Sequence, residues 1–219
     1  MNEGTDTDLA GMLRTRFRQL WHRLTSPGPH SDAIPVWDLL ERRYGEPRRR
    51  YHTLRHIGHC LDEMDPVISE LQSPDVVELA VWFHDVIHEP GATDNEARSA
   101  ELLRQVAGKH MAPGRIERVG ELILATTHLE TPRRHDARIL SDIDLSSLGA
   151  PWQRFLDNSA ALRAEQPDMS DADNRREKQR FLGGLVERDA IYYTATFRDR
   201  YESAARQNIQ RYLELLRSA

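Results

Sequence analysis

The chain has 219 residues, of which 39% are hydrophobic and 30% charged, and its formal net charge is −5. This length suits one domain with a buried core, and the acidic balance gives no reason to expect a nucleic-acid polymer or an acidic membrane as a partner. No apolar stretch approaches the roughly 20 residues that span a bilayer. Residues 1–9 are polar, so we expect no signal peptide, and the single Cys60 allows no internal disulfide. These features predict a cytoplasmic protein.

Apolar residues recur at three- and four-residue spacing along the chain, which predicts helices, whereas signals for strands are scarce. The first two predicted helices are residues 8–24 and 32–44, and a longer third one follows Tyr51 with apolar residues from Leu54 to Ile68 on one face. The fourth runs from Pro74 to the His84-Asp85 pair, and the next opens near residue 95. The remaining predicted helices are residues 114–127, 136–147, 151–165, 171–190 and 196–217. The breaker Ser26-Pro27-Gly28-Pro29 separates the first two helices. Residues 191–194 are β-prone, but one short run does not make a sheet. The prediction is an all-α fold with one domain.

Two of the predicted helices begin with capping signals. Ser73 followed by Pro74 is typical of an N-cap with proline at the first helical position. The run Thr93-Asp94-Asn95-Glu96 has the form of a capping box, which would explain Glu96 without a role at a functional site.

The dipeptide His84-Asp85 carries the strongest chemical signal, because it follows the apolar run of residues 80–83. A carboxylate beside an imidazole at the end of a buried segment is costly unless a cation compensates it, and a divalent metal ion would do so. The alternative is a histidine stabilised by the dipole at a helix C-terminus, next to a solvated Asp85. The dipeptide alone leaves both interpretations open.

Histidines and aspartates elsewhere in the chain offer further ligands. His52 and His56 are four residues apart and share a helix face, with His59 one turn beyond His56. We favour His56 as the ligand because it lies near the core boundary; the alternative is an exposed polar stripe. Asp142 and Asp144 would point about 200° apart on one helix, so one is expected to face inward and the other outward or to a cap.

Two other features could contribute to the same site. His128 follows the apolar helix 114–127, and it could act as a second-metal ligand or as a general acid or base near neutral pH. The basic cluster Arg48-Arg49-Arg50, with Arg55, is either a solvated surface or a holder of anionic substrate oxygens, since it lies beside His56.

In chain order, His56, His84-Asp85 and Asp144 form the H…HD…D pattern of the HD-domain superfamily of metal-dependent phosphohydrolases. Beyond about residue 35 the chain resembles the bacterial branch of predicted phosphohydrolases in that superfamily, through residues 50–56, 80–87, 95–100, 125–128, 142–149 and 205–208. Two positions depart from the branch. His88 stands where an aromatic residue is expected, and Ala164-Glu165-Gln166 stands where an acidic–aromatic pair is expected after Arg163.

The resemblance implies an HD-type helical bundle at residues 31–219, preceded by an N-terminal helical extension at residues 1–30, with a metal site between helices. It implies four metal ligands, namely His56, His84, Asp85 and Asp144, with Asp142 as the fallback for the last. Mixed His and carboxylate ligation suits Mn, Fe, Co, Ni or Zn, and Mg is compatible with the carboxylates. One metal is favoured over two, because among the additional histidines only His128 matches the superfamily well.

The expected reaction is hydrolysis of a phosphate ester, with nucleotides among the candidate substrates, by a metal-activated water. Asp85 would orient the water, and the remaining expected catalytic residues, which would take or supply the proton, are His52, His128 and Glu96. Arg50 and Arg55 would bind the phosphoryl group of a small phosphorylated substrate. Two alternatives remain open: a non-catalytic protein that binds or senses a metal and an anionic ligand such as a nucleotide, and a redox-active metal pair. No motif specifies the substrate or the oligomeric state.

Overall fold

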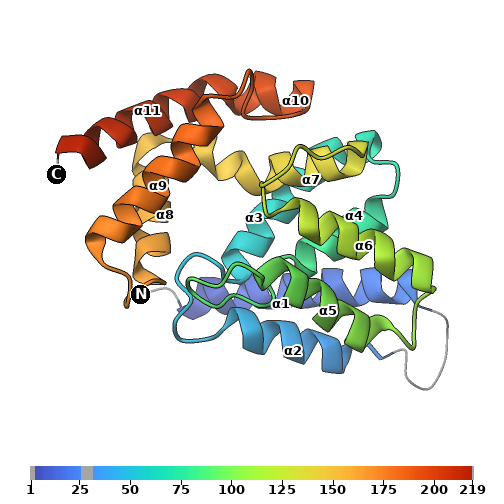
Figure 1. The fold of residues 1–219 in the computed structure, drawn as a ribbon. Helices are drawn as coiled ribbons and strands as arrows, with labels where there is room; N and C mark the ends of the chain where they lie inside the picture. The colour runs from blue at the N-terminus through green and yellow to red at the C-terminus, as the bar shows by residue number, and fades with distance from the viewer. Residues whose placement is uncertain (1–2, 26–31, 219) are drawn as a thin grey trace.

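The computed structural model describes residues 3–25 and 32–218, and in these ranges it consists of helices joined by loops, without a strand (Figure 1). The all-α prediction is confirmed. The α-helices are α1 (Glu3–Leu24), α2 (Ile34–Tyr44), α3 (Leu54–Met64), α4 (Pro74–Phe83), α5 (Asn95–Ala107), α6 (Pro113–Ala125), α7 (His135–Leu145), α8 (Trp152–Ala164), α9 (Asp171–Val186), α10 (Ala195–Phe197) and α11 (Ser203–Ser218). Two 3₁₀ segments, η1 (Asp65–Glu70) and η2 (Ser146–Gly149), and a π-helical turn, η3 (Arg198–Glu202), complete the elements.

Aromatic side chains from α1, α2 and α4 pack together in the core. Phe17 of α1, Trp37 of α2 and Trp82 of α4 are fully buried, and the ring of Trp82 lies 5.4 Å from that of Phe17 and 6.1 Å from that of Trp37. The first helix therefore packs into the same core as the rest of the domain. The breaker at residues 26–29 and the expected domain boundary after residue 30 lie outside the described residues.

Several helix boundaries differ from the predictions for local reasons. The third helix ends at Met64, because Pro66 has no N–H to continue the α-helical ladder, and the chain continues as η1. Ile68 consequently leaves the apolar face and is 47% exposed. The last predicted helix, 196–217, is interrupted by η3 before α11. Residues 191–194 form no strand, in agreement with the prediction.

The capping box predicted at residues 93–96 does not form. Asp94 is the N-cap of α5, and its side chain makes no capping hydrogen bond. The side chain of Asn95 instead bonds to both the N–H and the carbonyl of Glu89, at 2.9 and 3.0 Å. The side chain of Asn95 thus ties the first residue of α5 to the preceding loop, and Glu96 does not have the capping-box role expected for it.

The side chain of Arg49 links the segment before α3 to the turn after α4. The buried guanidinium of Arg49 donates to the carbonyls of His52, Asp85 and Val86 at 3.0, 2.7 and 3.0 Å, which holds these two segments together.

Helices α8, α9 and α11 form a separate layer beside the helices α1–α7 (Figure 1). Within the described residues, no helix is both long enough and apolar enough to cross a membrane.

Candidate metal centre

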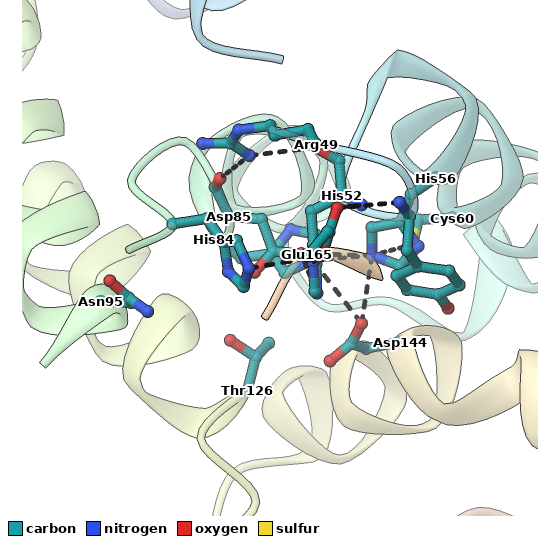
Figure 2. A network of polar contacts seen from close by, with 12 residues as sticks. Arg49, His52, His56, Cys60, His84, Asp85, Asn95, Thr126, Asp144 and Glu165 are labelled. Atoms are coloured by element: carbon teal, nitrogen blue, oxygen red, sulfur yellow. Dashed lines mark hydrogen bonds and ion pairs between the residues drawn. The ribbon is translucent and has the colours of Figure 1, made fainter. Parts of the chain in front are cut away.

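Four side chains from three parts of the chain converge on one point (Figure 2). His56 lies in the first turn of α3, His84 and Asp85 follow the last residue of α4, and Asp144 lies in α7. Nε2 of His56 is 3.2 Å from Nε2 of His84 and 3.3 Å from Oδ1 of Asp144. Oδ2 of Asp85 is 2.9 Å from Nε2 of His84 and 3.4 Å from Nε2 of His56. We call these four residues the His–Asp centre.

Local structure sets the direction of the two imidazoles. His84 is the C-cap residue of α4, and its Nδ1 lies 2.9 Å from the carbonyl oxygen of Val81. When Nδ1 donates its proton to that carbonyl, the lone pair of Nε2 points into the centre. His56 lies three residues after the N-cap Thr53, whose hydroxyl accepts from the backbone N–H of Arg55. One helix end and one helix start therefore present the two Nε2 atoms.

The electrostatics of the centre favour a bound cation. The side chains of His56 and His84 are each 2% exposed, and burial opposes the charged form of every group in the centre. The carboxylates nevertheless raise the pKa of His84 well above its usual range, and histidines lower the pKa of Asp85 and Asp144 well below theirs. In the described part of the chain, the ion pairs of both carboxylates are with histidines. A divalent ion would neutralise these two charges without protonating the imidazoles.

The spacing of the donor atoms also fits one ion. Ligands held about 2.1 Å from a metal, at angles of roughly 90° to 110°, lie about 3.0–3.4 Å from one another. The distances in the His–Asp centre run from 2.9 to 3.6 Å. The residues present could therefore hold a divalent metal ion, and two nitrogens with two oxygens suit the transition metals expected from the sequence.

Cys60 borders the centre one turn after His56 on α3. Its thiol is buried and free, and Sγ lies 3.7 Å from Nε2 of His56. Ligand atoms of His56, Cys60, His84 and Asp144 all lie within 4.8 Å of one another. A sulfur donor at this position would favour Zn, Fe or Co over Mg. Cys60 was not predicted from the sequence to belong to the site.

His128 supports Asp144 from outside the centre. Nε2 of His128 lies 2.8 Å from Oδ2 of Asp144, whereas Oδ1 faces His56. The preceding helix ends at Ala125, and His128 has a φ of 56°, a left-handed conformation. This conformation costs a non-glycine residue roughly 1–2 kcal/mol. The guanidinium of Arg188 donates to the carbonyl of His128 at 3.1 Å and supports this turn. A strained turn, rather than the expected helix end, therefore brings His128 to Asp144.

Asp142 faces away from the centre. Its carboxylate accepts hydrogen bonds from the N–H of Tyr193 at 2.7 Å and from the N–H and hydroxyl of Thr194 at 2.8 and 2.7 Å. Burial raises the pKa of Asp142 to about 6, although these hydrogen bonds oppose the rise. Asp142 thus anchors residues 191–194, and Asp144 is the carboxylate of α7 that lies in the centre.

Glu96, Arg50 and Arg55 are the other residues predicted to act at the site. Glu96 is half-buried, and burial together with the charges of Asp85 and Asp144 raises its pKa. Arg50 and Arg55 are exposed and line a cavity of about 240 Å³, whose lining includes His56 of the centre but not His84, Asp85 or Asp144.

His59 has a different hydrogen-bond partner from the residues of the centre. Its Nε2 is 2.9 Å from the hydroxyl of Ser146, and burial lowers its pKa. Of the three histidines considered along α3 and its approach, the structure therefore places His56 in the centre, His52 next to it, and His59 against η2.

The structure also contains a carboxylate that the sequence analysis did not assign to the site. Glu165 is the C-cap of α8 and only 1% exposed, and its Oε1 accepts from the N–H groups of residues 50–52 at 2.6, 2.8 and 3.0 Å. Oε2 of Glu165 lies 2.6 Å from Nδ1 of His52 and 3.4 Å from Nε2 of His88. Nε2 of His52 lies 3.9 Å from Oδ2 of Asp85. Glu165 therefore orients His52 next to the His–Asp centre (Figure 2).

Comparison with known proteins adds no relative. A scan against models of protein families found no match, and neither did searches of curated proteins and of solved structures. What the centre can do therefore has to be inferred from its own residues.

Proposed function

We propose that this chain is a metal-dependent phosphohydrolase of the HD superfamily, which hydrolyses a phosphate ester. The observation that carries the proposal is the convergence of His56, His84, Asp85 and Asp144 in one nearly closed centre. Their order along the chain is the H…HD…D order of that superfamily, and a buried set of two imidazoles and two carboxylates is suited to a divalent metal ion.

A divalent ion in the centre would supply a bound water of lowered pKa and polarise a phosphoryl oxygen. The two carboxylates form the accessible side of the centre, since Asp85 is 16% and Asp144 17% exposed while both imidazoles are covered. Asp85 can accept a hydrogen bond from a water on that side and so orient it for attack. Asp144 is held in place through its second oxygen by His128.

Proton transfer is assigned to side chains that surround the carboxylates. The 3.9 Å gap between Nε2 of His52 and Oδ2 of Asp85 is too long for a direct hydrogen bond, and it allows one water or substrate oxygen to bond to both atoms. Glu96, whose pKa is raised, can hold a proton for the leaving oxygen. Arg50 and Arg55 border a cavity that reaches His56 but neither carboxylate of the centre, and they would bind an anionic part of the substrate there.

The direct test is metal analysis of the purified protein, followed by a screen of phosphomonoesters and nucleotides with Mn, Co, Ni and Mg. His84→Ala and Asp85→Ala should each lower the metal content and abolish hydrolysis. Asp144→Asn should do the same, whereas Asp142→Asn, two residues away on α7, should retain the metal and serves as the matched control.

Unchanged metal content and hydrolysis in His84→Ala and Asp85→Ala would refute the assignment of the centre. A nucleotide that co-purifies with the protein and is not turned over with any of the four metals would refute hydrolysis and favour a binding or sensing protein.

A further inference from the structure

A second group of metal-ligating atoms lies beside the His–Asp centre and shares no residue with it. Atoms of His52, His88 and Glu165 all lie within 4.8 Å of one another. Oε2 of Glu165 faces Nδ1 of His52 at 2.6 Å and Nε2 of His88 at 3.4 Å. The two imidazole rings pack against each other with centroids 4.0 Å apart and planes tilted by 32°, and each presents a nitrogen to the same carboxylate oxygen.

Glu165 is held in the orientation that a ligand requires. Three backbone N–H groups, from residues 50, 51 and 52, bind Oε1 and leave Oε2 directed at the two histidines. The side chain is 2% exposed, and its pKa lies below the usual range despite the burial, because His52, His88 and the backbone of Arg50 stabilise the charged form. An ionised carboxylate fixed through one oxygen costs little further ordering when its other oxygen binds a cation.

We propose that His52, His88 and Glu165 form a second divalent-metal site, in which two imidazole nitrogens and one carboxylate oxygen are the protein ligands. This donor set suits Zn, Co, Ni and Fe(II) and disfavours Ca. The side chains of His52 and His88 are each 16% exposed, so water can complete the coordination. When the ion binds, the proton that Nδ1 of His52 shares with Glu165 leaves Nδ1, and the neutral ring that ligates the metal carries its proton on Nε2.

The site would join three segments that are distant in the sequence. His52 lies in the segment before α3, His88 in the loop after α4, and Glu165 at the end of α8. An ion bound by Glu165 and the two histidines would crosslink the layer of α8, α9 and α11 to the helices that carry the His–Asp centre (Figure 1). The total capacity would then be two ions per chain, where the sequence favoured one. The proposal is independent of whether the chain is a hydrolase.

The test is the number of metal ions bound by the full chain. The protein is stripped with a chelator, dialysed against Zn or Co, and analysed for metal per chain. Wild type should bind two ions, and His88→Phe, which keeps a ring to stack on His52 but has no ligand nitrogen, should bind one. His84→Ala should also bind one, and the double variant none. His22→Phe, at an exposed histidine of α1, is the matched control and should bind two.

Each outcome separates the two sites. If wild type binds one ion and His88→Phe also binds one, the second site is refuted while the His–Asp centre stands. If His84→Ala binds as many ions as wild type and His88→Phe binds one fewer, the second site stands and the His–Asp centre fails. Glu165→Gln keeps an acceptor for the three backbone N–H groups and gives an independent readout if His88→Phe does not fold. Two ions bound to Glu165→Gln would then refute the second site.

Discussion

Glu165 is the residue whose removal should reveal most about how the two layers of the fold are joined. Glu165→Ala removes the acceptor for three backbone N–H groups and for His52. Hydrogen bonds to a charged group contribute about 1.5–3 kcal/mol each when buried, and because these donors are half-buried we take about 1 kcal/mol for each of the four. The expected loss in the free energy of unfolding is therefore roughly 4 kcal/mol. Glu165→Gln retains an oxygen for the backbone donors and should lose only about 1–2 kcal/mol.

The measurement is urea unfolding of metal-free protein, followed by circular dichroism. With a slope of about 2.5 kcal/mol/M, the midpoint of Glu165→Ala should fall by roughly 1.5 M relative to wild type. Glu187 is a matched control, because it is the exposed C-cap of α9 as Glu165 is the buried C-cap of α8. Glu187→Ala should lie within about 0.5 kcal/mol of wild type. A Glu165→Ala variant as stable as Glu187→Ala would show that the carboxylate does not hold the layers together.

Three further predictions concern α7 and the two buried histidines. Asp142→Ala should destabilise the fold by about 3 kcal/mol through the loss of three hydrogen bonds, with no change in metal content; loss of the metal would contradict its placement outside the centre. The pKa of Asp142 is raised to about 6 in the folded state, so its contribution to stability is present below its unfolded pKa and is lost as the pH rises through about 6. Between pH 4 and pH 7, wild type should therefore lose roughly 2–3 kcal/mol of unfolding free energy relative to Asp142→Asn. Parallel pH profiles of the two proteins in urea unfolding would refute this. The raised pKa values of His56 and His84 mean that protons compete with a cation, so Zn or Co affinity in a competition titration should fall steeply as the pH is lowered from 8 to 6; a flat profile would argue against imidazole ligation.

The fold class and most of the helices were predictable because periodic apolar residues report directly on helical faces. The departures come from interactions that periodicity does not contain. Pro66 ends the third helix one turn early because it has no N–H, although apolar periodicity continues to Ile68. The capping box at residues 93–96 does not form because α5 begins at Asn95, with Asp94 rather than Thr93 as its N-cap residue.

His84 and Asp85 were predicted because they follow an apolar run at a helix end, where a polar side chain is conspicuous, and His56 and Asp144 because they complete the ordered pattern that the chain resembles. Glu165 offered no such signal, because its partner His52 lies 113 residues away in the sequence. His88 was noticed only as a departure from the pattern that the chain resembles. A long-range contact between a carboxylate and an imidazole leaves no local trace in either segment, so only the folded chain reveals it.

Asp142 and Asp144 show how two identical side chains on one short helix acquire different roles. Helical geometry requires that they point in nearly opposite directions, but it does not say which faces the histidines. That choice depends on residues 193 and 194, whose backbone N–H groups need an acceptor and find it in Asp142. With Asp142 held there, α7 can present only Asp144 to His56 and His84, and His128 then takes its second oxygen. The hydrogen bonds of a distant loop, rather than the metal site, thus set the rotation of α7.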